Sequence, residues 1–448
     1  MKPNVVFLLI DNLRSDQTFG TKKKSCTPNL DTMLNKGVYF ENCFSSADGT
    51  ILSLNCIFNS KFPTSNLHKR AKKIILSEEN LFSVLKNNGY NIFGLVPEMI
   101  TFQPIAKLFE NEEKTYKFVN NFESLDSGLT NKILKVLKLI NHKRPSFFYI
   151  HLMDLHPDKQ GKYLNELNEM PIDIINSSNY VETVSGIDPH LGKIFDVLDL
   201  SNTILVLTAD HGDRIPYENI KNTDFEPKFE ITKKIGKRVL PTSIHQLGGK
   251  FLYKSRKIIS NKKIKENRKK LSNYQNRSRE SYFIHSLYDE SLHVPLLLVG
   301  NTIPSEIFSE NISQVDIFPT ICDLVDIENK LKNDGENLLK IIAGKKYEKK
   351  SIYLHTIPYE KPHPTDMVGI RDSNFKYFRA ASDKNENVHL YNLKIDPLEN
   401  TNIAETNSSI ISEFETLISK FEANQNLSKT ESDEDPEVIE ELKKLGYL

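Results

Sequence analysis

Short apolar runs alternate with segments of helical periodicity along most of the chain, and this alternation constrains the fold more than any other feature. The clearest predicted strands are 4–10, 91–95, 146–152, 203–208 and 294–299. Predicted helices lie at 29–35, 80–87, 131–140, 184–198 and 315–324. Strands that are separated by helices pair in parallel, because the returning connection needs the length of a helix. The sequence therefore predicts an α/β fold with a large, mostly parallel sheet flanked by helices.

The pattern shortens after residue 327. Four short runs, 351–355, 368–371, 375–379 and 389–393, are separated by brief polar segments, which favours an antiparallel sheet. We expect a catalytic domain at 1–327 and a small C-terminal α+β subdomain at 328–448. The subdomain should contain this antiparallel sheet, a polar linker at 424–428 and a terminal helix at 438–448.

Composition narrows the functional classes. The 448 residues include 59 basic and 59 acidic side chains, so net charge gives no reason to expect a nucleic-acid partner. No run approaches the roughly 18 apolar residues of a membrane span. The apolar stretch 5–10 is too short for a secretory signal, so we expect a cytoplasmic protein. The four cysteines are scattered, unlike a disulfide framework.

One segment departs from this balance. Residues 227–270 contain fifteen basic side chains and two acidic ones, which indicates an insertion. Such a charge run usually forms a solvated surface. The alternative is a lid, hinged at Gly248 and Gly249, that attracts a polyanionic substrate such as a phosphorylated glycan or an anionic lipid head group.

Acidic side chains follow two of the predicted strands. Asp11 comes directly after 4–10, and Asp210 and His211 closely follow 203–208. The carboxyl ends of strands form the ligand crevice of open α/β sheets, so these distant residues can converge on one ion. Carboxylates and an imidazole suit Ca²⁺, Mn²⁺, Mg²⁺ or Zn²⁺. The alternative is that each carboxylate caps the helix after it.

A hydroxyl-rich loop, 45–53, leads into the apolar segment 54–58. A hydroxyl at the start of a helix faces unsatisfied N–H groups and the positive end of the helix dipole, where sulfate and phosphate bind. A nearby metal would also make an alcohol nucleophilic. Thr50 and Ser53 are both candidates, and helix capping is the alternative role.

Several motifs in order resemble the sulfatases of the alkaline phosphatase superfamily. They are 2–16 (KPNVVFLLIDNLRSD), 27–31 (TPNLD) with 37–40 (GVYF), 208–213 (TADHGD), 287–296 (LYDESLHVPL), 315–320 (VDIFPT), 391–393 (YNL) and 445–447 (LGY). The resemblance covers most of the chain outside 111–141, the basic insertion and the polar linker. It implies an alkaline-phosphatase-like fold, with a large mixed sheet and a small C-terminal domain of antiparallel strands against one helix.

The resemblance also assigns roles to particular residues. It implies that Asp11, Asn12, Asp210 and His211 are ligands of a divalent metal, with Asn12 standing where many sulfatases have a second Asp. Counting back from 61–63 (KFP) places Thr50 at the nucleophile. His156 and His285 match active-site histidines of the family. We expect structural roles for His151, His245 and His293.

The departures from the family are equally informative. Formylglycine sulfatases carry Cys or Ser at the nucleophile, then Pro and Arg two and four places on, whereas this chain has Thr50, Leu52 and Leu54. A threonine cannot be oxidised to that aldehyde. The family's lysine-bearing segment is also missing from 94–98. The chain resembles the threonine-nucleophile branch, which favours phosphate esters or diesters over aryl sulfates.

Three functions remain open at this point. The first is a metal-dependent hydrolase of an anionic sulfate or phosphate ester that passes through a covalent Thr50 ester, with His156 or His285 protonating the leaving group. The second is a phosphotransferase that moves the phosphoryl-bearing group to an acceptor alcohol. The third is a noncatalytic anion-binding relative, motivated by the missing Arg, Lys and second Asp.

Overall fold

A computed structural model describes residues 2–64, 73–140, 143–161, 178–215, 268–278, 285–328, 333–345, 347, 351–358 and 365–423. The chain forms two compact units, one of residues 1–214 with 281–448 and one of residues 215–280. The described part of the second unit contains the short helix α11 (Asn273–Arg277). Most of the predicted basic insertion, including its proposed hinge, lies outside the described residues, as do the predicted linker and terminal helix.

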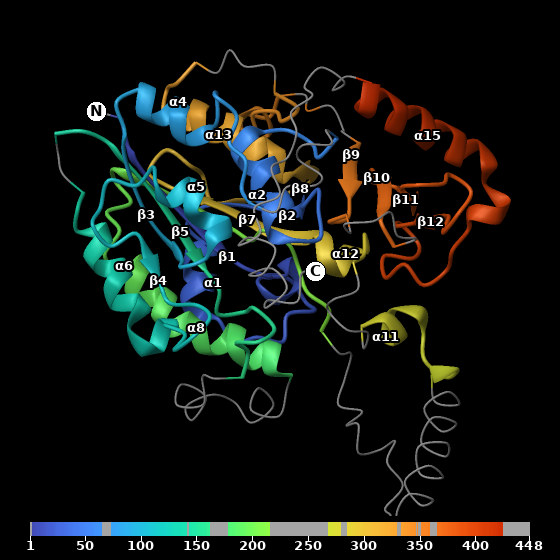
Figure 1. Ribbon diagram of the computed structural model, residues 1–448, viewed down its shortest axis with the longest axis horizontal. Coiled ribbons are helices and arrows are strands. Elements are labelled where there is room, and N and C mark those ends of the chain that lie inside the picture. Colours follow the sequence, from blue (N-terminus) through green and yellow to red (C-terminus); the bar gives the residue numbers. More distant parts are fainter. Residues whose placement is uncertain are drawn as a thin grey trace, which may run out of the picture. The chain divides into compact units, whose positions relative to one another are not determined.

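The first unit contains an eight-stranded sheet in the order β4-β3-β5-β1-β6-β7-β2-β8 (Figure 1). Its strands are β1 (Asn4–Ile10), β2 (Val38–Phe44), β3 (Asn91–Pro97), β4 (Thr115–Tyr116), β5 (Ser146–Leu152), β6 (Thr203–Thr208), β7 (His293–Val299) and β8 (Glu306–Ser313). All neighbouring pairs are parallel except those of β7, which runs antiparallel to both β6 and β2. The predicted mixed, mostly parallel sheet is confirmed.

The central strands β1, β5 and β6 are buried along their whole length, as expected for a sheet covered on both faces. Tyr149 of β5 shows how the helices attach. Its ring contacts Phe7 of β1 edge-on at 5.6 Å and Phe58 at 5.1 Å, and Phe82 lies 4.8 Å from Phe58 between ring centroids. Phe58 and Phe82 belong to two helices on the same face. Aromatic packing therefore fixes the helix that follows the hydroxyl-rich loop.

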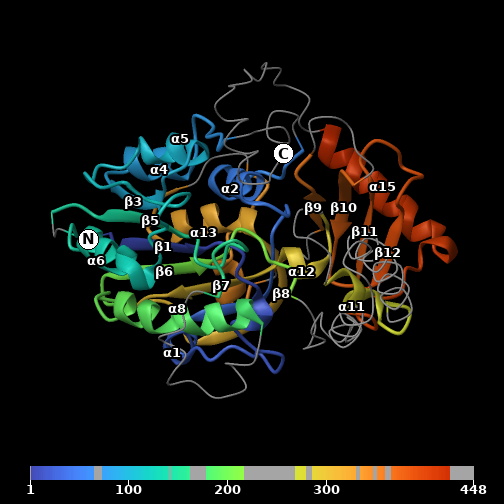
Figure 2. The ribbon, with the colours of Figure 1, turned by 60° about the horizontal axis from the view of Figure 1, so that its bottom comes forward.

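Helices cover both faces of this sheet (Figure 2). On one face lie α1 (Pro28–Leu34), α6 (Thr130–Leu137) and α8 (Asn179–Phe195); on the other lie α2 (Thr50–Asn59), α4 (Leu81–Asn87) and α13 (Ile317–Leu324). The shorter helices are α5 (Gln103–Ala106), α12 (Asp289–Leu292) and α14 (Leu339–Ile342). Within the described ranges, no helix has both the length and the apolar character needed to cross a bilayer.

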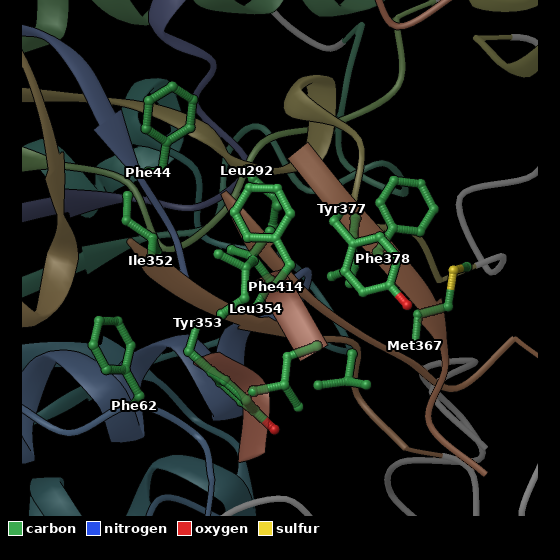
Figure 3. Close-up of a cluster of buried hydrophobic side chains, with 14 of the residues drawn as sticks. Phe44, Phe62, Leu292, Ile352, Tyr353, Leu354, Met367, Tyr377, Phe378 and Phe414 are labelled. Carbon is green, nitrogen blue, oxygen red and sulfur yellow. The ribbon is translucent and has the colours of Figure 1, made fainter. Parts of the chain in front are cut away.

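The small sheet is fully antiparallel, as the sequence predicted. It comprises β9 (Ile352–His355), β10 (Met367–Arg371), β11 (Phe375–Ala380) and β12 (His389–Asn392), in the order β12-β11-β10-β9, with α15 (Ser408–Ala423) alongside. Figure 3 shows the apolar cluster that joins it to the large sheet, where Phe44, Phe62 and Leu292 pack with Phe378 and Phe414. Both sheets therefore share one hydrophobic core.

A buried ion cluster also connects the small sheet to α12. The Lys376 ammonium is fully buried and lies 2.5 Å from Asp289 Oδ1 and 2.7 Å from Glu399 Oε1. It also donates to the carbonyl of Leu287 at 2.9 Å. Arg371 pairs with Asp289 at 3.1 Å. Because α12 leads directly into β7, this cluster fixes the chain on one side of the sheet edge described below.

Three strands of the large sheet escaped the sequence analysis, and one of the predicted strands has an unexpected direction. The strand β4 has only two residues, too few to form a recognisable run. The strand β8 carries polar residues and is exposed over its first half because it is the sheet edge, so it lacks the apolar run of a buried strand. Glu41 and Asn42 interrupt the apolar pattern of β2. The predicted strand 294–299 exists as β7, but it is antiparallel to its neighbours. Helix α8 begins before its predicted start, where Ser178 accepts a hydrogen bond from the Val181 N–H.

Candidate active site

Elements from both halves of the chain meet at one edge of the large sheet. Asp11 follows β1 directly, and its N–H donates to the carbonyl of Leu152 at the end of β5 (2.9 Å). Asp210 follows β6, which pairs with β1 in parallel register. The antiparallel strand β7 begins at this edge, so the segment before it arrives there too. The sheet thus brings Asp11 and Asp210 together, as the sequence predicted.

The two carboxylates are fully buried, Asp210 bonded by backbone N–H groups and Asp11 by side chains. Asp210 Oδ1 accepts hydrogen bonds from the N–H groups of Asn12 (3.1 Å) and His211 (2.8 Å). The Asn12 amide donates to Asp11 Oδ2 at 2.7 Å. Asn12 has a φ of 60°, a left-handed conformation that Asn adopts more easily than most residues. Asn12 therefore turns the chain so that its side chain and its N–H reach different carboxylates.

His151 joins this group, although the sequence analysis gave it a structural role. One ligand atom each from His151, Asp11 and Asp210 lie within 4.8 Å of one another, which is compatible with a shared metal ion. Its Nδ1 lies 2.9 Å from the hydroxyl of Tyr149, while its Nε2 has no hydrogen-bond partner. Burial lowers the pKa of His151 to about 4, so the ring is neutral at neutral pH and can ligate a cation.

The donor set fits a divalent cation. Burial, and next the carboxylate of Asp210, raise the pKa of Asp11 well above its usual range. Asp210 Oδ2 accepts no hydrogen bond. In the part of the chain that the structure describes, neither carboxylate forms an ion pair with a lysine or arginine. Two adjacent buried carboxylates whose basic neighbours there are histidines alone favour a cation between them.

Thr50 is the hydroxyl nearest to these carboxylates. It is the first residue of α2, and Gly49 occupies the N-cap position. The Thr50 hydroxyl donates to Asp11 Oδ1 at 3.2 Å and lies 3.4 Å from His211 Nε2. Its side chain does not cap the helix. The position instead combines the start of a helix with the carboxylate group, as a nucleophile toward an anionic ester requires.

Ser53, the competing candidate, lies one turn further along α2 and is fully buried. Its hydroxyl contacts the Ser45 hydroxyl at 2.9 Å and donates to the carbonyl of Ala47 at 3.2 Å. These bonds pin the loop before α2 against the helix. The Ser53 hydroxyl therefore supports the turn that presents Thr50.

His156 lies beyond the end of β5 and is nearly completely buried. Its ring packs edge-on against Phe118, with centroids 5.3 Å apart, and its Nδ1 accepts a hydrogen bond from the Asp158 N–H at 3.4 Å. The ammonium of Lys159 lies 4.6 Å from the same Phe118 ring. Burial lowers the pKa of His156 to about 4. At neutral pH this imidazole is uncharged.

His285 has the opposite electrostatic environment. Its Nδ1 lies 3.2 Å from Asp48 Oδ2, and Asp48 stands two residues before Thr50. Burial acts to lower the pKa of His285, but the Asp48 carboxylate outweighs burial and raises it. His285 is therefore charged over a wider pH range than His156. Asp48 was absent from the sequence-based site, because nothing near it in the chain signals a partner at residue 285.

Comparison with known proteins identifies the family of the chain. The sulfatase family model matches residues 3–327, and the C-terminal model of N-sulphoglucosamine sulphohydrolase matches residues 280–425. The chain is 22% identical over 470 residues to an N-acetylglucosamine-6-O-sulfatase from Bacteroides thetaiotaomicron, covering 90% of this chain and 82% of that protein. It is 28% identical over 130 residues to arylsulfatase K from Mus musculus, covering 28% of this chain and only 24% of that protein.

Solved structures share the fold. One is a protein in complex with its substrate D-glucosamine-2-N,6-O-disulfate, with a TM-score of 0.65, 14% identity and coverage of 96% of this chain and 100% of the other. Another is the phosphonate monoester hydrolase of Agrobacterium radiobacter, with a TM-score of 0.62, 15% identity and coverage of 97% and 98%. With the family model spanning most of its length, the chain belongs to the sulfatase family.

Proposed function

We propose that this protein is a metal-dependent hydrolase of anionic esters, that Thr50 is its nucleophile, and that it prefers phosphate esters or diesters to aryl sulfates. The observation that carries the proposal is the Thr50 hydroxyl, which lies 3.2 Å from Asp11 and 3.4 Å from His211 at the start of α2. The phosphate preference rests on Thr50 itself, because a threonine cannot supply the aldehyde that formylglycine sulfatases use.

The residues that would hold a divalent ion are Asp11, Asp210, His211 and Asn12, the last through the carbonyl oxygen of its side chain. His151 is a further candidate ligand. When bound, such an ion supplies positive charge that favours ionisation of an alcohol and stabilises the anionic group of the ester. The hard oxygen donors favour Mn²⁺, Ca²⁺ or Mg²⁺, and the imidazoles also admit Zn²⁺.

The residues of the chain divide the reaction between them. Asp11 orients the Thr50 hydroxyl through its hydrogen bond, and the first turn of α2 offers N–H groups to the ester's oxygens. Thr50 Oγ1 attacks as the alkoxide, and its bond to phosphorus or sulfur forms while the bond to the leaving oxygen breaks. Water then hydrolyses the Thr50 ester and releases the alkoxide for the next turnover.

His285 is the better proton donor of the two histidines. A general acid must hold a proton at the working pH. The pKa of His156 is lowered to about 4 by burial, whereas Asp48 raises that of His285. We therefore assign protonation of the leaving oxygen to His285, and a hydrogen-bonding role toward the substrate to the neutral His156.

The substrate class is proposed from the relatives as well as from the site. One relative is named as a sulfatase of a sulfated sugar, and another was solved in complex with a sulfated sugar. A third is a phosphonate monoester hydrolase. All of these substrates present a tetrahedral anionic group on an organic alcohol or acid. We propose a phosphorylated glycan or lipid head group as the natural ester.

The decisive experiment is a panel of aryl sulfates, phosphate monoesters, phosphate diesters and phosphonates with Mn²⁺, Ca²⁺, Mg²⁺ or Zn²⁺. We expect the highest kcat/KM on a phosphate ester, and at least about 10³-fold loss in Thr50→Ala. Ser53→Ala is the matched control, because it removes a hydroxyl from the same helix, and it should stay within about tenfold. Near-normal turnover by Thr50→Ala would refute the proposed nucleophile.

The same panel tests the two other functions. Addition of an acceptor alcohol would divert the phosphoryl group from water if the protein were a phosphotransferase, and product analysis separates the two reactions. An absence of metal-dependent turnover across all substrates would favour the noncatalytic anion-binding function.

A further inference from the structure

Asp48 accepts three hydrogen bonds from two distant parts of the chain. Its side chain is only 3% exposed. Oδ2 accepts from the Ser286 N–H at 2.7 Å and lies 3.2 Å from His285 Nδ1, while Oδ1 accepts from the Ile357 N–H at 2.9 Å. Two backbone donors thus fix the carboxylate in place. The His285 imidazole is therefore oriented by a carboxylate that backbone hydrogen bonds hold in position.

This geometry assigns the two ring nitrogens of His285 different roles. Nδ1 faces a carboxylate, so it carries a proton in both the neutral and the charged ring. Nε2 is consequently the atom that gains and loses a proton. The same carboxylate lies two residues before Thr50, so the turn that presents the nucleophile also presents the partner of the imidazole.

The charges around His285 agree with this arrangement. Asp48 and Asp366 favour the charged imidazole, and Arg214 opposes it. Asp48 has the larger effect of the two carboxylates and is the one in contact. Burial acts to raise the pKa of Asp48, but His285, and next the N–H groups of Ile357 and Ser286, hold it below its usual value. The two backbone donors act whatever the charge of the imidazole.

We propose that Asp48 is a positioning residue that holds the Nδ1–H of His285, so that Nε2 of His285 delivers its proton to the leaving oxygen of the ester. This inference deepens the proposed function and rests on it.

The proton balance follows from these roles. As the bond from phosphorus to the leaving oxygen breaks, its electron pair goes to that oxygen, which takes the proton from Nε2 and departs as an alcohol. His285 becomes neutral with its remaining proton on Nδ1. In the second step Nε2 takes a proton from the water that attacks the Thr50 ester, and the charged ring is restored. The bond from phosphorus to Thr50 Oγ1 breaks, and Oγ1 leaves as the alkoxide in which it attacked, so the two steps balance.

The test is Asp48→Asn, which keeps the size of the side chain and one acceptor oxygen. Loss of the carboxylate should lower the pKa of His285, so the alkaline limb of the kcat/KM profile should move down by about 1 pH unit. Turnover should fall about 10- to 100-fold for an alkyl phosphate, whose leaving group needs the proton, and less than about threefold for a nitrophenyl phosphate. Asp366→Asn is the matched control, because it removes a nearby negative charge without removing the contact to Nδ1.

The two outcomes for the proposal are distinct from those for the nucleophile. The positioning role would be refuted if Asp48→Asn kept the wild-type alkaline limb and lost the same factor in turnover on both substrates. This result would stand even if Thr50→Ala were inactive. Should Asp48→Asn fail to fold, ¹⁵N NMR of the wild-type histidines decides, with His285→Gln giving the assignment. A neutral His285 ring protonated at Nε2, or a pKa below about 6.5, would overturn the proposal.

Discussion

Two buried groups of charged side chains lie near α12 and the start of β7, and they differ in one respect. In the ion cluster, the carboxylates of Asp289 and Glu399 face the ammonium of Lys376 at 2.5 and 2.7 Å. At the sheet edge, Asp11 and Asp210 face each other, two histidines and a hydroxyl. Both groups are shielded from water, but only the first contains a lysine and an arginine.

The pKa directions show the consequence. Burial acts to raise the pKa of Asp289, yet Arg371 and Lys376 hold it well below its usual range. Burial and Asp210 together raise that of Asp11. Burial acts to raise the pKa of Asp210 as well, but His211 and next His151 hold it below its usual value. The comparison thus distinguishes a cluster that contains a lysine and an arginine from a pair of carboxylates whose basic neighbours are imidazoles, the donor types that fit a divalent cation.

The largest effect should come from removing the internal cation. Lys376→Met leaves Asp289 and Glu399 buried with one positive partner fewer, and we expect the free energy of unfolding to fall by about 3–5 kcal/mol. Chemical denaturation measures this. Lys340→Met, which removes an exposed ammonium 3.8 Å from Glu336, should change stability by less than about 1 kcal/mol. Equal effects of both substitutions would mean that the ion cluster is not structural.

Supplying the external cation should have the next largest effect. A divalent ion at about 100 times its Kd should raise the free energy of unfolding by about 2.7 kcal/mol. Thermal denaturation with chelator and with added Mn²⁺ or Ca²⁺ measures it. The increase should vanish in Asp11→Asn, while Asp289→Asn, if folded, should retain it. An ion that stabilised Asp11→Asn as much as wild type would place the metal elsewhere.

The two groups should also respond in opposite directions to loss of a carboxylate. In the presence of chelator, Asp11→Asn should raise the free energy of unfolding by about 1 kcal/mol, because it removes a buried charge whose pKa is raised. Asp289→Asn should lower it by about 3 kcal/mol. Destabilisation of the metal-free protein by Asp11→Asn would show that Asp11 has a structural partner.

The smallest effect concerns pH. Burial raises the pKa of Glu399 to about 7, against the opposing charge of Lys376. A folded pKa above the unfolded value of 4.5 means that the native protein keeps a proton that the unfolded chain has released. Stability from this group is complete below about pH 4.5 and is lost as pH rises to about 7. Denaturation at pH 5 and 8 measures the free energy of unfolding. Between these pH values it should fall less in Glu399→Gln than in the wild-type protein.

The sequence revealed the central strands and the carboxylates because both signals are local. Asp11 and Asp210 stand where apolar runs end, and parallel pairing of β1 with β6 then brings them to one edge. Thr50 was predicted from the resemblance, which places the nucleophile by counting back from residues 61–63. The antiparallel direction of β7 had no local signal, because an apolar run has the same composition in either direction.

The residues that the sequence missed depend on contacts across the chain. His151 lies inside an apolar run, and it becomes a candidate ligand only once the register opposite Leu9 places it beside Asp11. Asp48 binds groups at residues 285, 286 and 357, which are 237 to 309 positions away. Such partners follow from the tertiary fold alone.

The turn before α2 packs against residues at the end of β9 and just after it. A side chain at Gly49 would approach Ile357 Cδ1 to 2.1 Å, and Ala47 forms a bridge with His355 at the end of β9. The two sheets are therefore not interchangeable modules. A chain shortened after residue 327 would lose the surface that contacts the turn before Thr50, and replacement of the small sheet by that of a relative would change the shape of this turn.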